Sequence, residues 1–195
     1  CHTKKFILLN IDGMDVREYK ITDLRDKIGI VPQKAVLFAG TVRSNLAWGK
    51  EDATEEEMQQ ALSVAQAAEV VDKKDGKLDA EVEQGGKNFS GGQKQRLTIA
   101  RALVKQPEIL IMDDSSSALD YATDAKLRQA IHNMPNHPTV FIVSQRAASI
   151  MYADKIIVLD DGTVAGTGTH EELLKDCSVY QEIYYSQFKR TEGGH

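Results

Sequence analysis

The chain has 195 residues, enough for one domain with a sizeable core, and its formal net charge at pH 7 is -5. This charge argues against a general nucleic-acid binder, which usually carries a basic excess, and no stretch approaches the ~20 consecutive apolar residues of a membrane-spanning helix. Only 2 cysteines are present, so a disulfide framework is excluded and a cytosolic setting is expected.

The first third of the chain predicts short elements separated by turns. Asp12-Gly13 is a tight-turn pair, Pro32 should end a strand because proline cannot donate to a ladder, and Thr54 opens a helix with a Thr-x-x-Glu capping box. In chain order the expected elements are a strand and turn at 6–16, a short helix at 21–27, a strand at 28–33, a loop with a helical turn at 41–49 and a helix at 54–71.

The remainder alternates buried strands with helices, which implies a mostly parallel α/β sheet. The Asp161-Gly162 pair predicts the turn of a hairpin. The expected elements are a polar loop at 73–92 running into a helix at 90–106, a strand buried on both faces at 107–114, a helix at 124–132, a second buried strand at 139–145, a hairpin at 155–170 and an amphipathic helix at 170–188.

One feature with chemical potential is the run NFSGGQ at residues 88–93, which stands at the start of a predicted helix. A glycine pair there lets backbone N–H groups approach an anion closely, and the helix dipole favours negative charge at that end. Ser90 adds a hydroxyl donor. Taken alone, the run is explained equally well as an ordinary N-cap turn.

A second feature is the pair Asp113 and Asp114, which closes an apolar strand. Ligands of open α/β sheets bind at the carboxyl ends of the strands. A carboxylate there can hold magnesium on a nucleotide, and a neighbouring carboxylate can orient or deprotonate water. Taken alone, the pair could equally cap the next helix.

Together the two features resemble the ABC ATPase family. The run FSGGQKQRLTIARALVKQPEILIMDDSSSALD (89–120) is similar, almost residue for residue, to the family's stretch from the signature to Walker B. Further resemblances follow in family order: a Q-loop at 31–33, the exporter-type stretch EVEQGG at 81–86, a D-loop at 117–120, and a C-terminal hairpin with the start of its following helix at 160–173.

The resemblance implies an α/β fold of the P-loop NTPase type, with a mostly parallel sheet and a helical signature region inserted at about 50–107. No GxxxxGK[ST] phosphate loop precedes Gln33, where the family has one. The simplest interpretation is that residues 1–195 form a single partial domain that lacks the family's N-terminal strands and phosphate loop. A protein that dispenses with the loop is the alternative.

Carried over residue by residue, the resemblance implies a site for ATP and Mg²⁺. Asp113 and Gln33 would hold the metal, and Asp114 and Gln145 would stand at the catalytic positions. The residues expected to contact the nucleotide are Gln33, Ser90, Gly91, Gly92, Gln93 and Asp120.

Two catalytic positions depart from the family pattern. Asp114 stands where the family has glutamate, and its shorter arm should position water poorly, because a general base must be within hydrogen-bond reach. Gln145 stands where the family has histidine. Glutamine can donate a hydrogen bond to a γ-phosphate, but it has no proton to exchange near neutral pH.

These losses resemble the degenerate half of a heterodimeric, multidrug-exporter-like ABC transporter. The implied partners are a second ABC ATP-binding domain and an exporter's transmembrane domain, which would hold the chain at the cytoplasmic face of the cell membrane. In the family two domains sandwich two nucleotides head to tail, so hydrolysis is expected in the intact dimer and not in the isolated chain.

Two other functions remain open. One is a subunit that holds nucleotide without hydrolysing it. The other is a soluble ABC ATPase of DNA repair or translation, against which the EVEQGG stretch, the segment at 41–49 and the lack of a coiled-coil insertion argue.

Overall fold

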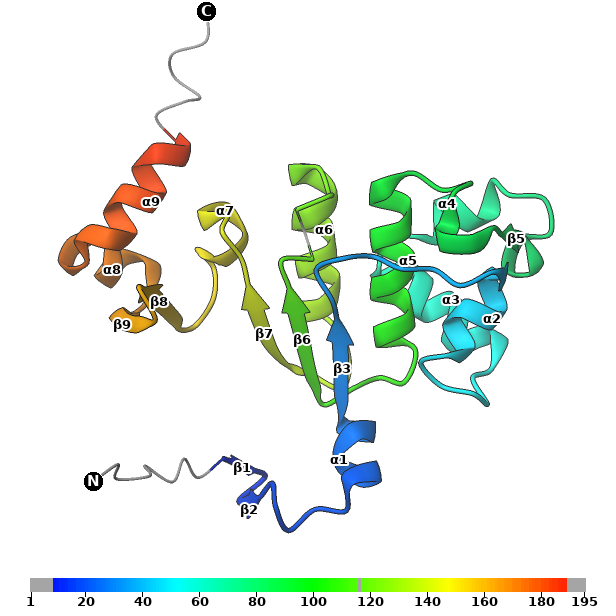
Figure 1. Cartoon of the computed structure of the whole chain (residues 1–195), viewed down its shortest axis with the longest axis horizontal. Helices are drawn as coiled ribbons and strands as arrows, with labels where there is room; N and C mark the ends of the chain where they lie inside the picture. Colours follow the sequence, from blue (N-terminus) through cyan, green and yellow to red (C-terminus); the bar gives the residue numbers. More distant parts are fainter. Residues whose placement is uncertain (1–8, 116, 189–195) are drawn as a thin grey trace, which may run out of the picture.

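A three-stranded parallel sheet lies at the centre of the computed structural model, which describes residues 9–115 and 117–188 (Figure 1). Its strands are β3 (Ile28–Val31), β6 (Ile109–Asp113) and β7 (Thr139–Val143), in that order. The parallel register aligns Ile30, Ile111 and Phe141 in one row across the sheet. The expected α/β fold with a parallel sheet is therefore confirmed.

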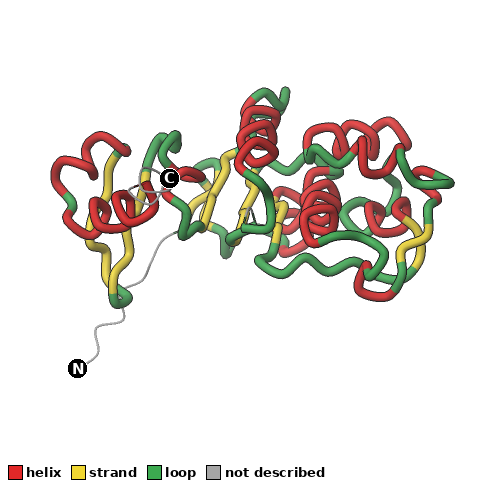
Figure 2. The backbone as a smooth tube through the Cα atoms, turned by 90° about the horizontal axis from the view of Figure 1, so that it is seen from above, coloured by secondary structure: helices red, strands yellow, loops and turns green. Residues whose placement is uncertain are grey.

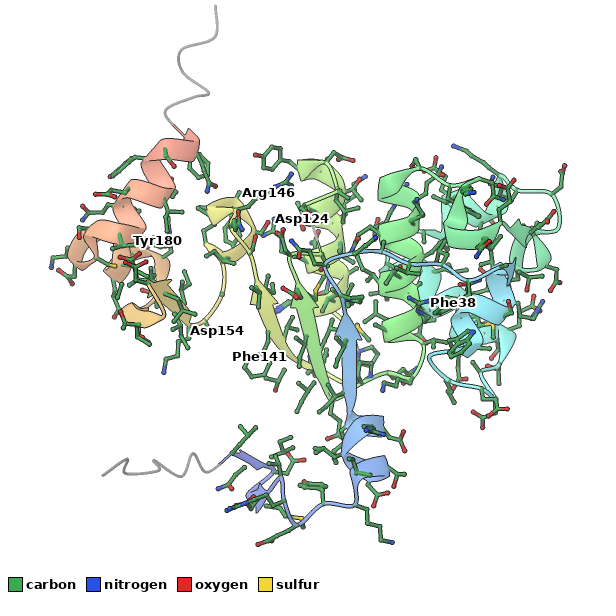
Figure 3. The ribbon with its side chains drawn as sticks, in the orientation of Figure 1. Phe38, Asp124, Phe141, Arg146, Asp154 and Tyr180 are labelled. Atoms are coloured by element: carbon green, nitrogen blue, oxygen red, sulfur yellow. The ribbon has the colours of Figure 1, made fainter. Side chains whose placement is uncertain are left out.

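Helices cover one face of this sheet and leave the other uncovered. Helices α5 (Gly91–Leu103) and α6 (Tyr121–His132) share one hydrophobic core with the buried strand residues Leu110 and Met112. On the opposite face Phe141, labelled in Figure 3, is 56% exposed. The strand at 107–114, predicted to be buried on both faces, leaves Ile111 only half-buried, and the second strand predicted to be buried, at 139–145, exposes Phe141, because no described element packs on this face of the sheet.

A mainly helical region lies beside α5, on the side away from the sheet (Figure 1). Helix α5 packs against α2 and α3 of this region and also against β3, so it joins the region to the sheet. The region follows β3 and precedes β6, as expected of the segment at about 50–107, whose boundaries stay a prediction. It comprises α2 (Val42–Ala47), α3 (Glu55–Val64), α4 (Ala68–Asp72), the 3₁₀ turns η1 (Lys77–Asp79) and η2 (Gln84–Gly86), and the paired strands β4 (Gly40–Thr41) and β5 (Glu81–Val82).

The single helix expected at 54–71 is two helices, α3 and α4. The predicted capping box at Thr54 is present, but Gln66 adopts a left-handed conformation with a φ of 57°. The Ala67 N–H then donates to the Leu62 carbonyl at 2.7 Å, a longer reach than an α-helix uses. Ala65 and Ala67 are both fully buried at this corner, so tight packing accompanies a break that helix propensity does not predict.

The C-terminal part forms a second hydrophobic core, and Figure 2 shows the backbone of this part at one end of the elongated molecule. Strands β8 (Ile156–Asp160) and β9 (Thr163–Gly168) form the predicted hairpin. The helix expected at 170–188 is interrupted at Cys177, whose backbone is extended, and becomes α8 (His170–Asp176) and α9 (Ser178–Phe188). A short unpredicted helix, α7 (Ala147–Ile150), packs against α9.

The N-terminal segment forms the predicted turn and helix, and residues 6–8 of the strand expected at 6–16 lie outside the described residues. Strands β1 (Asn10–Ile11) and β2 (Met14–Asp15) pair around the Asp12-Gly13 turn, and α1 spans Ile21–Lys27, as expected. Lys27 fastens α1 to the start of β6 through Glu108, at 2.6 Å. None of the helices within the described residues is both long and apolar enough to cross a bilayer.

Gly49 provides a test of the packing between α2 and α5. A Cβ at this position would lie 2.0 Å from the Arg101 carbonyl oxygen, so Gly49→Ala must push the two segments apart. We expect it to lower the free energy of unfolding by about 1–3 kcal/mol, the usual cost of overpacking. A Cβ at Gly91 meets nothing within 4 Å, so Gly91→Ala is the matched control. Equal thermal unfolding midpoints by circular dichroism would contradict this packing.

Candidate functional site

Polar side chains gather where β3, β6 and β7 end. Asp113 is the last residue of β6 and pairs with Val143 of β7, while Gln33 follows β3 closely. The Gln33 Nε2 donates to Asp114 Oδ2 at 3.5 Å, across 81 positions of sequence. The structure therefore brings together Gln33, Asp113 and Asp114 at the edge where α/β sheets bind ligands.

Asp114 is placed by its backbone. Its φ of 41° is left-handed, an uncommon conformation for a residue with a side chain. Its N–H donates to the Val143 carbonyl at 2.8 Å, and its own carbonyl accepts from Ser117 Oγ at 2.9 Å. These bonds hold a sharp turn that redirects the chain from β6 into the segment at 117–120, and they aim the carboxylate away from the sheet core.

Gln145 lies in the exposed segment that follows β7. Its backbone carbonyl accepts a hydrogen bond from Gln187 Nε2 at 2.7 Å. Within residues 9–115 and 117–188 its side-chain amide has no hydrogen-bond partner, so it is not joined to Asp114 or Gln33 here. The side chain is thus available to a ligand at this edge.

Arg146 joins this segment to the predicted D-loop, a role that the sequence did not reveal. Its guanidinium donates to the carbonyls of Ser117 at 2.9 Å and Leu119 at 3.2 Å. It also lies 5.5 Å from the centre of the Tyr121 ring (Figure 3 labels the arginine). The only indication in the sequence was its place directly after Gln145. The structure makes it a bridge between the two loops that flank the carboxylates.

The N-terminus of α5 lies toward the same edge as the strand ends. The helix runs antiparallel to β3, because its end approaches the start of that strand: a Cβ at Gly29 would lie 2.9 Å from the Ala102 carbonyl oxygen. Ser90 is the N-cap, and its hydroxyl accepts from the Gln93 N–H at 3.3 Å. Gln93 Oε1 accepts in return from the Ser90 N–H at 3.0 Å, which completes a capping box.

The two glycines of the signature run have different surroundings. Gly91 borders open space, so a ligand can approach its backbone closely. A Cβ at Gly92 would lie 3.1 Å from the Ala118 carbonyl oxygen, so the absence of a side chain lets the helix start pack against the D-loop. The structure therefore places the signature beside the D-loop and leaves one face of it open.

The loop before α5 is braced by contacts that the sequence reading missed. Asn88 donates through Nδ2 to the Glu81 carbonyl at 2.8 Å and accepts from the Glu83 N–H at 3.1 Å. Lys74 donates to the Asn88 carbonyl at 3.1 Å and lies 4.6 Å from the centre of the Phe89 ring. A lysine in a polar loop carries no sequence pattern that would mark such a role. The brace fixes the start of α5 to the helical region.

Asp120 caps α6, which explains why this helix begins earlier than the expected start at 124. Its carboxylate accepts from the Thr123 N–H at 2.9 Å and from the Thr123 hydroxyl at 2.8 Å. These hydrogen bonds, the one from the Thr123 backbone first, hold the pKa of the Asp120 carboxyl below its ordinary value. The contact between Asp120 and a nucleotide stays a prediction.

Asp113 and Gln33 carry side-chain oxygen atoms that could hold magnesium together with a nucleotide. Among the residues that the structure describes, no group of three or more His, Cys, Asp or Glu side chains could hold a metal ion. Magnesium in nucleotide sites is typically bound by one or two carboxylates together with substrate phosphates and waters. The oxygen donors at these strand ends fit an ion that arrives with a nucleotide.

Comparison with known proteins identifies the family of this chain. The family model for ABC transporters matches residues 7–117. An ABC transporter ATP-binding protein of Mycobacterium tuberculosis is 48% identical over 188 residues, which cover 94% of this chain and 32% of that protein. The beta-(1→2)glucan export ATP-binding/permease protein NdvA of Rhodopseudomonas palustris is 43% identical over 181 residues, which cover 93% of this chain and 30% of the relative.

A solved structure of an ABC exporter has the same fold as this chain. A bacterial Atm1-family ABC exporter with ATP bound superposes with a TM-score of 0.84 at 35% sequence identity. The match covers 95% of this chain and 32% of the exporter chain, so this chain spans about a third of the length of the proteins that it matches. The family model, these relatives and the shared fold show that the chain belongs to the ABC transporter family.

Proposed function

We propose that this chain is the signature-bearing part of an exporter's ATP-binding domain and that it drives transport by closing on a second such domain. The observation that carries the proposal is the placement of two kinds of candidate nucleotide-binding group toward one edge of the molecule. The carboxylates and Gln33 stand at the strand ends, and the open start of α5 at Gly91 lies beside the D-loop. The phosphate loop would come from sequence outside these residues.

An exporter is favoured over a soluble ABC ATPase. The relatives that match along most of this chain include an export ATP-binding/permease protein and an Atm1-family exporter. The described surface also has an open groove of about 470 Å³ between β3 and the helical region, lined in part by Phe38, Trp48 and Arg101. Trp48 is 70% exposed and its ring centre lies 4.8 Å from that of Phe38. An exposed aromatic pair is typical of a contact surface, and we assign it to the transmembrane domain.

The two kinds of nucleotide-binding group would serve different nucleotides. In a head-to-tail pair, the residues at this chain's strand ends face one ATP, while Ser90, Gly91, Gly92 and Gln93 complete the site built on the partner. The backbone N–H groups at the start of α5 and the positive end of the helix dipole suit a γ-phosphate there. The brace from Lys74 and Asn88 holds these groups before the ligand arrives.

At this chain's own site the residues bind nucleotide better than they activate water. Asp113 and Gln33 would hold magnesium, whose charge offsets that of the phosphates. Gln145 would donate a hydrogen bond to the γ-phosphate. Asp114 has a shorter side chain than glutamate, so its carboxylate is poorly placed to accept a proton from water. This favours a heterodimer in which hydrolysis occurs mainly at the partner's nucleotide, and in which this chain's site chiefly holds ATP.

Substitutions in the signature and at the strand ends can be compared for their effect on ATP hydrolysis in the intact, full-length dimer. Ser90→Ala or Gly91→Asp should abolish most ATP hydrolysis, because donors aimed at developing phosphate charge are worth ~10²–10³ in rate and an aspartate adds a repelling charge. Asp113→Asn should cost far less, because it affects only the weak site. Steady-state ATPase activity of these variants is the measurement. If Asp113→Asn proved the more damaging, this chain's own site would be the working one.

The impaired site can be restored by design. With the partner's catalytic glutamate disabled, Asp114→Glu combined with Gln145→His should raise ATP turnover at this chain's site, because both changes supply groups that position and activate water. Each single substitution serves as a control and should raise turnover less than the pair. Unchanged turnover in the double variant would show that these two residues are not what limits hydrolysis there.

A further inference from the structure

The side-chain amide of Gln187, on the C-terminal helix α9, clamps the segment that carries Gln145. Its Nε2 donates to the Gln145 carbonyl at 2.7 Å, and its Oε1 accepts from the Ala147 N–H at 2.9 Å. One amide thus satisfies the two peptide groups on either side of Arg146. The two hydrogen bonds span 40 and 42 positions of sequence, so they are tertiary contacts and not part of a local turn.

The helix that carries Gln187, α9, is held in place by the second hydrophobic core. Gln187 follows Tyr180 by two helical turns, so the two side chains project from the same face of α9. Tyr180 is 1% exposed in the second hydrophobic core, where Figure 3 shows it between α9 and the β8–β9 hairpin. Helix α9 also packs against α7 and β8. The position of the amide is therefore set by the C-terminal core and not by the loop that it holds.

The segment is held on its other sides as well, with one side chain left available. The Arg146 N–H donates to Ser144 Oγ at 3.0 Å, and the Arg146 guanidinium is bonded to the D-loop carbonyls. Every bond to Gln145 in the described structure is made through its backbone. The main chain of Gln145 is thus fixed while its side-chain amide stays open to a ligand.

We infer that Gln187 is a positioning residue, which sets the main chain at Gln145 so that the Gln145 amide reaches the terminal phosphate of ATP bound at this chain's site. The inference rests on the proposed nucleotide site and adds the C-terminal helix to it. It predicts that loss of the two Gln187 hydrogen bonds weakens the binding of ATP but not of ADP, because ADP lacks the γ-phosphate.

Gln187→Glu is the most informative variant. Glutamate keeps the size of the side chain and an oxygen that can accept from the Ala147 N–H, but it loses the donor and sets a carboxylate against the Gln145 carbonyl oxygen. Gln187→Met removes both hydrogen bonds without adding charge. If Gln187 served only to pack α9, neither substitution would change the affinity for ATP.

Gln181 supplies a matched control on the same helix. Its Nε2 donates to the Leu174 carbonyl at 2.8 Å and the Lys175 carbonyl at 3.3 Å, so it also fastens α9 through a side-chain amide. Those carbonyls belong to α8 and not to the segment after β7. Gln181→Glu therefore perturbs α9 by the same chemistry without touching Gln145.

The test is calorimetric titration of MgATP and MgADP into the full-length dimer, with the partner's phosphate-loop lysine replaced by alanine so that this chain's site is read alone. Gln145→Ala and both Gln187 variants should lower the affinity for ATP about fivefold, the net worth of one hydrogen bond, and leave that for ADP unchanged. Gln181→Glu should change neither affinity.

The outcomes distinguish a failure of the positioning role of Gln187 from a failure of the proposed nucleotide site. If Gln145→Ala lowers the affinity for ATP and the Gln187 variants do not, the positioning role is overturned and the proposed function stands. An equal loss in Gln181→Glu also overturns it, because α9 then acts only as a general support. If Gln145→Ala leaves both affinities unchanged, Gln145 does not contact the γ-phosphate, and the proposed site and the role of Gln187 fall together.

Discussion

The site depends on the parallel register of β3, β6 and β7. Pairing of Val31 with Met112, and of Asp113 with Val143, brings three distant parts of the sequence to an end at one edge. Gln33, the two aspartates and Gln145 all follow from that alignment, since each comes within a few residues of a strand end. A slip of one residue would turn Asp113 to the other face of the sheet and bury its carboxylate among the helices, because side chains alternate along a strand.

Contacts to backbone carbonyls connect two loops at this edge of the sheet, the segment after β7 and the D-loop. Arg146 donates to the carbonyls of Ser117 and Leu119, so the segment after β7 is joined directly to the D-loop. The close approach of Gly92 to Ala118 adds the start of α5 to these joined loops. A change at the carboxylates therefore has a direct path to the surface that would meet a second domain, which is what an ATP-driven closing motion requires.

Much of the fold was predictable from the sequence, and the roles assigned to the site residues stay predictions, although the structure places Gln33, Asp113 and Asp114 close together. Local rules sufficed for α1, for the capped start of α5 and for the Asp161-Gly162 hairpin, because turn and cap residues act over a few positions. They failed at Gln66, whose left-handed turn accompanies the burial of two alanines, and at β7, whose exposed face depends on what packs against it. Lys74 and Gln187 could not be predicted either, since their roles come from contacts 14 and 42 positions away.

A head-to-tail pair requires the signature of this chain to complete a nucleotide site on another domain. Disulfide trapping in the full-length dimer tests this requirement, with one cysteine at Ser90 and a second in the phosphate loop of either the full-length protein that contains this chain or the partner. An ATP-dependent cross-link is expected when the second cysteine is in the partner, and none when it is in the same protein. A cross-link formed only within this chain would contradict the head-to-tail arrangement and the division of labour between the two sites.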